Sequence, residues 1–226
     1  MIVQRPVELP PALEERFARV AARLADFDVE LPKAAAQTLT RVVLVSDFVL
    51  GVLLRHPQLL SARLADDGSL DPKSIMARLD LAPGNEAQAM TALRRMRDVE
   101  MARIAWHDLA GVADLDATLA DVSLLAECLI EAALGFAAAS LEPRLGRPRD
   151  ADGRELPLLV LGMGKLGGVE LNFSSDVDLV FLYPDGAVEG SVQVEPESYY
   201  LRLGQDRKST RLNSSHSSPS RMPSSA

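Results

Sequence analysis

The stretch Leu-Leu-Val-Leu-Gly-Met-Gly-Lys-Leu-Gly-Gly at residues 158–168, followed by Asp-Val-Asp at 176–178, decides the fold of this chain. The apolar run from Leu156 to Leu161 has the length and composition of a buried strand. The glycines that follow predict a tight turn. Val177 to Tyr183 predicts a second strand, which stops at the turn signal Pro184-Asp185-Gly186.

Two carboxylates, Asp176 and Asp178, stand at the start of this second strand at positions i and i+2, a spacing that projects both to one face. Hard oxygen ligands at that spacing can share one or two Mg²⁺ ions that bridge to phosphate oxygens. A glycine turn nearby lets backbone approach phosphates without a side chain in the way. A D-x-D pair alone usually marks a solvated strand edge or turn. Coupled to the two strands and the glycine turn, it predicts a catalytic site for a metal-bound nucleotide.

The same glycines allow a second interpretation. Residues 162–167 fit the G-x-G-x-x-G fingerprint of Rossmann-like oxidoreductases, and they follow a predicted strand. That fold needs a crossover of commonly a dozen or more residues between parallel strands. Only the eight residues 168–175 are available, and the fold gives no role to the paired carboxylates. The dinucleotide site is therefore the weaker hypothesis, and a non-catalytic helical interaction module is a third.

The residues before this sheet predict helices. The stripe Leu13, Phe17, Val20, Leu24 and Phe27 marks the first one, which begins at Pro11. Further helices are expected over about 33–55 and 85–109, and from a cap at Asp114 to about Glu142. Another begins within Tyr199–Leu203. Trp106 is predicted to be a packing anchor, and the group Arg94, Arg95, Arg97 and Arg103 to form a solvated or salt-bridged face. The fold class is α+β.

Composition and charge argue against some classes of partner. The chain has 226 residues, of which 47% are hydrophobic and only 4% aromatic, a balance that favours helices. A net charge of −8 argues against a nucleic-acid partner. The longest apolar run, Val42 to Leu54, is too short to span a bilayer, so no membrane partner is expected. The absence of a signal peptide and the single Cys128, predicted to be buried, favour a cytoplasmic location.

The chain divides into three predicted regions. A polar loop, Arg144 to Glu155, separates a helical region, 1–143, from the domain that carries the glycine turn, 144–205. Residues 206–226 are rich in Ser and poor in apolar side chains, and this predicts disorder. The run Asp-Arg-Lys-Ser-Thr-Arg-Leu-Asn-Ser-Ser-His in this tail resembles translated sequencing adapter. We therefore expect the tail to be artefactual, and His216 within it is no functional candidate.

Residues 162–181, from Gly-Met-Gly-Lys-Leu-Gly-Gly to Ser-Ser-Asp-Val-Asp-Leu-Val-Phe, closely resemble the N-terminal catalytic half of bacterial glutamine synthetase adenylyltransferase/adenylyl-removing enzymes. Residues 101–109 and 200–205 resemble the same family. The resemblance implies a partial polymerase-β-like nucleotidyltransferase domain behind a helical region. It further implies an enzyme that removes AMP from a tyrosine of glutamine synthetase by phosphorolysis, while a second half adds AMP from ATP. The implied substrates are ATP, ADP and phosphate, and the implied regulators are the PII signalling protein and glutamine.

The resemblance also assigns residues. Asp176 and Asp178 would be Mg²⁺ ligands, and the phosphate-side candidates are Gly164, Lys165, Gly167, Gly168 and Ser175. Two departures stand out. Val169 occupies a position where the family often carries Arg or Gly. The family's third carboxylate, expected on a strand after Gln205, is replaced by the adapter-like tail, so we expect little or no activity from this chain alone.

Overall fold

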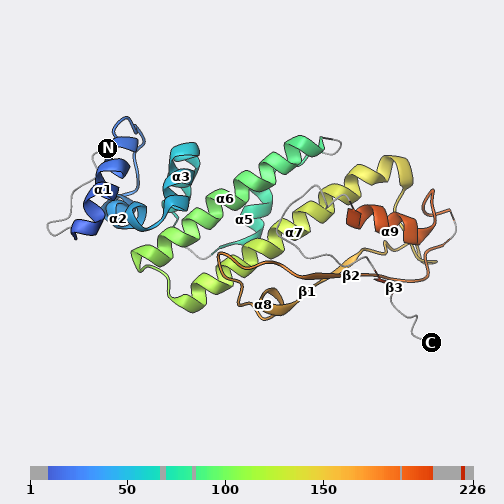
Figure 1. The fold of residues 1–226 in the computed structure, drawn as a ribbon. Coiled ribbons are helices and arrows are strands. Elements are labelled where there is room, and N and C mark those ends of the chain that lie inside the picture. Colours follow the sequence, from blue (N-terminus) through green and yellow to red (C-terminus); the bar gives the residue numbers. More distant parts are fainter. Residues whose placement is uncertain (1–9, 67–69, 83–84, 189, 206–219, 222–226) are drawn as a thin grey trace. The chain divides into compact units, whose positions relative to one another are not determined.

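A computed structural model describes residues 10–66, 70–82, 85–188, 190–205 and 220–221 (Figure 1). The helices are α1 Pro11–Arg23, α2 Lys33–Val45, α3 Asp47–Arg55, α4 Pro57–Leu64, α5 Pro72–Arg78, α6 Glu86–Ala110, α7 Leu115–Leu145, α8 Gly164–Gly167 and α9 Pro196–Gln205. The strands are β1 Leu159–Gly162, β2 Leu179–Tyr183 and β3 Ser220–Arg221. The described part of the chain is thus mostly helical with one small sheet, which agrees with the predicted α+β class.

The chain forms two compact units. Unit 1 comprises Met1–Asp71 and Arg95–Leu125, and unit 2 comprises Pro72–Arg94 and Ala126–Ala226. Helices α6 and α7 each contribute residues to both units. The domain boundary expected between residues 143 and 144 stays a prediction.

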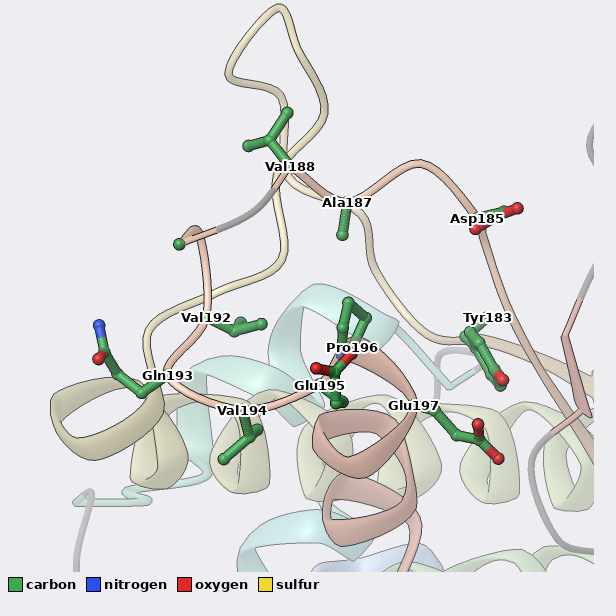
Figure 2. A pocket seen from close by; sticks show the side chains of 11 residues that line it. Tyr183, Asp185, Ala187, Val188, Val192, Gln193, Val194, Glu195, Pro196 and Glu197 are labelled. Carbon is green, nitrogen blue, oxygen red and sulfur yellow. The ribbon is translucent and has the colours of Figure 1, made fainter.

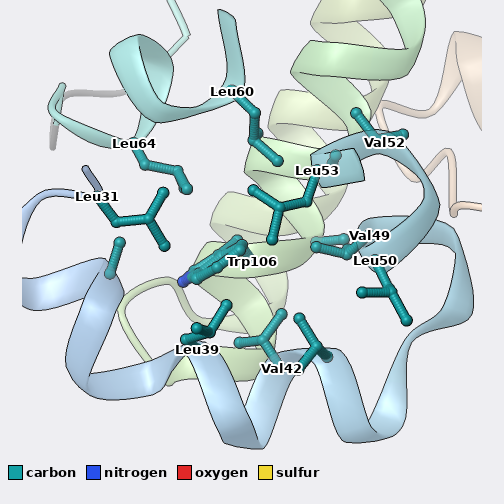
Figure 3. Packing of buried hydrophobic residues seen from close by; sticks show 14 of the residues in the cluster. Leu31, Leu39, Val42, Val49, Leu50, Val52, Leu53, Leu60, Leu64 and Trp106 are labelled. Carbon is teal, nitrogen blue, oxygen red and sulfur yellow. The ribbon is translucent and has the colours of Figure 1, made fainter. Parts of the chain in front are cut away.

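The core of unit 1 is organised around Trp106 of α6, which is 1% exposed (Figure 3). Its indole Nε1 donates a hydrogen bond of 2.9 Å to Thr38 Oγ1 on α2. Leu39, Leu53 and Leu60, from three different helices, belong to the same buried cluster. A large ring whose single polar atom is satisfied stabilises such a core, so the predicted packing role of Trp106 is confirmed.

The helix predicted over 33–55 is two helices. Ser46 leaves the helical conformation (φ −129°, ψ 104°), and its Oγ accepts a hydrogen bond from the Val49 amide at 3.2 Å. Ser46 therefore caps α3, a role for which serine is well suited. The apolar pattern runs through this break because both helices bury side chains in the same core, so it could not reveal the break.

Unit 1 also buries charge. Glu100 and Arg103 on α6 are both fully buried. Arg63 Nε donates to Glu100 Oε1 at 2.8 Å, and the Arg103 guanidinium lies 3.8 Å from Asp121 Oδ2. Arg94 and Arg95 are exposed, as the predicted polar face requires. Arg103 is salt-bridged, as predicted, but it lies in the interior and not on a surface face, and neighbouring carboxylates offset the cost of burying its charge.

The sheet belongs to unit 2. Strands β1 and β2 pair antiparallel, with Leu159 opposite Leu182 and Leu161 opposite Val180. β3 pairs with β2 in parallel through Ser220 and Arg221, which are the described residues of the predicted tail. The side chains of Leu179, Phe181 and Tyr183 alternate toward the interior and are buried. Leu159 and Leu161, on the opposite face, are 44% and 41% exposed.

Helix α9 is held in unit 2 by aromatic contacts. The rings of Tyr183 and Tyr200 stack with centroids 4.8 Å apart, and Tyr199 meets Tyr200 edge to face at 5.4 Å. The Tyr200 hydroxyl donates a hydrogen bond of 2.6 Å to the Leu156 carbonyl. Three contacts of different kinds therefore converge on one buried side chain, Tyr200.

Helix α7 begins where the sequence predicts. The Asp114 Oδ1 accepts a hydrogen bond from the Ala117 amide at 2.9 Å. The helix continues through Pro143 and ends at Leu145, slightly beyond the predicted end. Cys128 lies buried on it, as predicted. By length and composition α7 could also cross a membrane, but half of its apolar window is buried in the structure, and core helices of soluble proteins have this same character.

Candidate functional site

The glycine turn follows β1 directly and contains the single-turn helix α8. Gly164 has a φ of +56°, in the left-handed region that glycine adopts without strain. A Cβ at Gly167 would lie 2.5 Å from the Gly162 carbonyl oxygen. Gly167 therefore allows the turn to fold back against the end of β1. The Gly168 amide donates to the Gly164 carbonyl at 3.0 Å, which closes the turn.

Val169, at the end of this turn, has a φ of +58° and is 52% exposed. A β-branched residue in this region is an outlier because its side chain crowds the backbone. Val169 is also the position where the sequence departs from the pattern of the family that it resembles, which often has Arg or Gly there. In the structure it is a site of backbone strain beside the candidate site.

Asp176 and Asp178 lie in the irregular segment just before β2, which begins at Leu179, two residues later than the predicted strand. The Met163 amide donates a hydrogen bond of 2.9 Å to the Asp178 carbonyl, which extends the pairing of β1 and β2 by one step. Because side chains alternate along a strand, Asp178 shares the outer face of the sheet with Val180 and Leu182. Asp176 and Asp178 are both exposed. The backbone of Asp178, one of the two predicted metal ligands, is therefore hydrogen-bonded to the first residue of the turn predicted to hold phosphate.

The donor set fits Mg²⁺. This ion is usually held by one or two carboxylates, with water and substrate phosphates completing its shell. No cluster of three or more acidic, His or Cys side chains able to hold a metal occurs among the described residues. Two exposed carboxylates beside a glycine turn suit an ion that arrives with a nucleotide better than one enclosed by protein ligands alone.

A side-chain bridge links the turn to the carboxylate segment. Lys165 Nζ donates to Ser175 Oγ at 3.3 Å, and Ser175 Oγ donates to Asn172 Oδ1 at 2.6 Å. The structure thus brings two predicted phosphate-side residues, Lys165 and Ser175, into contact. Asn172 was not among the predicted site residues, because its role depends on the fold of the 172–175 turn. The functional roles predicted for the glycines, Lys165, Ser175 and the two Asp residues stay predictions.

The antiparallel pairing of β1 and β2 overturns the dinucleotide interpretation. A Rossmann unit joins parallel neighbouring strands through a crossover helix. Here the two strands are adjacent and antiparallel, and the connecting segment contains one helical turn, α8. The fingerprint match at 162–167 therefore has no structural counterpart.

A separate groove of about 620 Å³ lies beyond the other end of β2 (Figure 2). Its walls include Tyr183, Asp185, Val188, Glu195 and Glu197. None of the predicted site residues lines it. The candidate site around the glycine turn and the carboxylates is thus separate from this groove.

Comparison with known proteins identifies the family. The family described as glutamate-ammonia ligase adenylyltransferase matches residues 36–219, a range that extends into the predicted tail. The chain is 45% identical over 177 residues to the bifunctional glutamine synthetase adenylyltransferase/adenylyl-removing enzyme of Thioalkalivibrio sulfidiphilus, covering 75% of this chain and 18% of that protein. It is 42% identical over 200 residues to the protein of the same name in Xanthomonas campestris, covering 86% and 21%.

The protein of that name in Shewanella loihica is 37% identical over 210 residues, which cover 88% of this chain and 22% of that protein. The chain thus spans about a fifth of the length of the curated relatives it matches. The range matched by the family includes β1, β2, the glycine turn and both carboxylates. The chain therefore belongs to the glutamate-ammonia ligase adenylyltransferase family.

Proposed function

We propose that this chain carries the nucleotide- and Mg²⁺-binding part of an enzyme that removes AMP from a tyrosine of glutamine synthetase. The observation that supports the proposal is the hydrogen bond between the Met163 amide and the Asp178 carbonyl, which joins the glycine turn to the segment that carries the carboxylates. Family membership and the names of the relatives supply the protein substrate. The domain would have a polymerase-β-like fold and act in the cytoplasm.

The proposed reaction is a phosphorolysis. An oxygen of inorganic phosphate attacks the phosphorus of the adenylyl group, and the bond between that phosphorus and the tyrosyl oxygen breaks. The tyrosyl oxygen takes up a proton, and the products are ADP and unmodified glutamine synthetase. The second catalytic half of the longer relatives would carry out the opposite modification, the transfer of AMP from ATP.

Each residue of the candidate site has a proposed task. Asp176 and Asp178 would hold Mg²⁺, which when bound neutralises the charge that develops on the transferred group. Gly164, Gly167 and Gly168 would let phosphate oxygens approach the backbone of the turn. Lys165 would contribute positive charge to the phosphate side. The PII signalling protein is the proposed regulatory partner, and it would act through the longer protein.

Nucleotide binding tests the proposal without requiring the protein substrate. We expect the purified chain to bind ADP more tightly with Mg²⁺ than without it. Asp176→Asn or Asp178→Asn should weaken Mg²⁺-dependent binding by about tenfold or more, since each removes a charged ligand oxygen. Asp185→Asn is the matched control, because Asp185 lies beyond the other end of β2 and its amide analogue still accepts the Gly186 N–H.

The substrate is tested separately. Adenylylated glutamine synthetase, phosphate and Mg²⁺ are mixed with this chain or with a full-length relative, and ADP release is measured. ADP release by the full-length protein that depends on both aspartates supports the proposal. Absence of ADP release there, or ADP binding that Mg²⁺ does not strengthen, contradicts it. Glutamine synthetase binding unchanged by both substitutions would favour a non-catalytic interaction module instead.

A further inference from the structure

Asn172 fixes the turn that leads into the carboxylate segment. Its Oδ1 accepts hydrogen bonds from Ser175 Oγ at 2.6 Å and from the Ser174 amide at 3.3 Å. Its backbone carbonyl accepts the Ser175 amide at 3.2 Å. Two hydrogen bonds from Ser175 and one from Ser174 therefore hold this turn on Asn172 and set the position of Ser175, which directly precedes Asp176.

The direction of these bonds determines what Ser175 can do. A serine hydroxyl has one proton to donate. Ser175 donates that proton to Asn172, and its oxygen accepts a hydrogen bond from Lys165 Nζ at 3.3 Å. In this arrangement Ser175 acts as an acceptor that holds the lysine, and it does not donate to a phosphate. The Lys165 ammonium has three N–H groups, so two more can bind phosphoryl oxygens.

Holding a lysine in place matters because its long side chain is flexible. An exposed lysine loses considerable rotamer entropy when it binds an anion. A side chain that is already hydrogen-bonded in its bound position avoids part of that loss. The Lys165–Ser175 bond also brings a positive charge from the glycine turn to the residue beside Asp176.

We propose that Asn172 is a positioning residue that acts through Ser175 to hold the Lys165 ammonium for the phosphoryl oxygens of the nucleotide or of inorganic phosphate. The inference rests on the proposed function, since it names how that same site binds phosphate. Asn172 itself touches no substrate.

The affinity of the 226-residue chain for ADP with Mg²⁺, and separately for inorganic phosphate, tests this role. Lys165→Met should weaken binding about tenfold, and Asn172→Ala or Ser175→Ala about fivefold. Ser175→Thr keeps the bridging hydroxyl and should retain most of the affinity. If these variants lose affinity for ADP alone, Lys165 binds the nucleotide. If they lose affinity for inorganic phosphate, Lys165 binds the attacking anion.

The double variant Asn172→Ala/Lys165→Met separates positioning from a general structural effect. If Asn172 acts through the lysine, the double variant should bind as Lys165→Met does. If Asn172→Ala weakens ADP binding by the same factor in the wild-type chain and in Lys165→Met, the inference is overturned, because Asn172 would then act independently of Lys165. Unchanged affinity of Lys165→Met for both ADP and inorganic phosphate overturns the inference alone and leaves the proposed function standing.

A second readout needs no ligand. The mobility of the Lys165 ammonium, measured by ¹⁵N relaxation of Nζ, should rise in Asn172→Ala and Ser175→Ala, while Lys33 on α2 stays constant as an internal reference. Unchanged mobility overturns the inference whatever the nucleotide data show. If the wild-type chain binds neither ADP nor phosphate, the proposed function and the phosphate role of Lys165 both fall.

Discussion

At the scale of single residues, Val169 holds a backbone conformation that its side chain disfavours. With φ at +58°, it carries a strain of about 1–3 kcal/mol. We predict that Val169→Gly raises the free energy of unfolding by about 1 kcal/mol, after the greater chain entropy of glycine is subtracted. Urea denaturation followed by circular dichroism measures the change.

Val188→Gly is the matched control for this substitution. Val188 is also exposed, at 40%, but it is not among the residues with positive φ, so glycine there should lower stability. Equal losses of stability in the two variants would show that Val169 is not strained. If strain at residue 169 helps to shape the phosphate turn, the more stable Val169→Gly chain should also bind ADP more weakly.

Glu100 shows how one buried charge depends on another. Glu100 is fully buried and accepts a hydrogen bond from Arg63. The pKa of the neighbouring Arg103 is lowered, first by burial and then by the positive charge of Arg63. We predict that Glu100→Ala costs about 3–5 kcal/mol, because two guanidinium groups would lose their shared counter-charge. The urea midpoint of unit 1 unfolding, followed by Trp106 fluorescence, measures this loss.

The exposed pair Arg16–Asp47, at 3.0 Å, provides the comparison for Glu100. The Asp47 side chain is 74% exposed, so Asp47→Ala should cost less than about 1 kcal/mol. Similar losses at the two positions would mean that burial does not set the strength of the Glu100 interaction.

At the scale of elements, the glycine turn depends on one close approach. Gly167→Ala would set a Cβ 2.5 Å from the Gly162 carbonyl oxygen, a contact that only backbone movement relieves. We predict a loss of about 1–3 kcal/mol in stability, together with loss of Mg²⁺-dependent ADP binding. Thermal unfolding and an ADP titration measure the two effects.

Gly168→Ala is the control because the nearest atom to its added Cβ lies at 3.5 Å, an ordinary contact, and its φ of −86° suits any residue. If Gly168→Ala proved as harmful as Gly167→Ala, the close approach of residue 167 to β1 would not be the cause.

The elements also show what sequence patterns could and could not predict. Short apolar runs and the turn signal at 184–186 predicted both strands, and the Asp114 cap predicted the start of α7, because these signals are local. The break at Ser46 was missed because the apolar pattern continues through it. The positive φ of Val169 and the Lys165–Ser175–Asn172 bridge could not be predicted from sequence patterns, since both depend on how the turn closes on β1.

At the scale of the whole chain, the two compact units differ in architecture. Unit 1 is a helical core with buried ion pairs, and unit 2 holds the sheet and every predicted site residue. The sequence predicted a helical region and a site-bearing region, but it did not predict that α6 and α7 would each contribute to both. Apolar periodicity reports which face of a helix is buried, and it does not report which partner covers that face.

Alkaline pH should weaken unit 2 through Tyr200. Burial, followed by the neighbouring Tyr199 and Tyr183, raises the pKa of Tyr200 above the value of 10.0 for an ordinary tyrosine. A group whose pKa is raised in the folded state contributes stability below its unfolded pKa. That contribution falls as pH rises above about 10, because the unfolded chain then releases a proton that the folded chain retains.

We therefore predict that the urea midpoint of the wild-type chain falls more steeply between pH 9 and about 11 than that of Tyr200→Phe. The substitution also removes the hydrogen bond to the Leu156 carbonyl, so at pH 8 it should cost about 1–2 kcal/mol. The stability difference between the two chains should thus shrink as pH rises. Other groups titrate in both chains and cancel in the comparison. Parallel curves over the whole range would show that the Tyr200 hydroxyl ionises in the folded chain as readily as in the unfolded one.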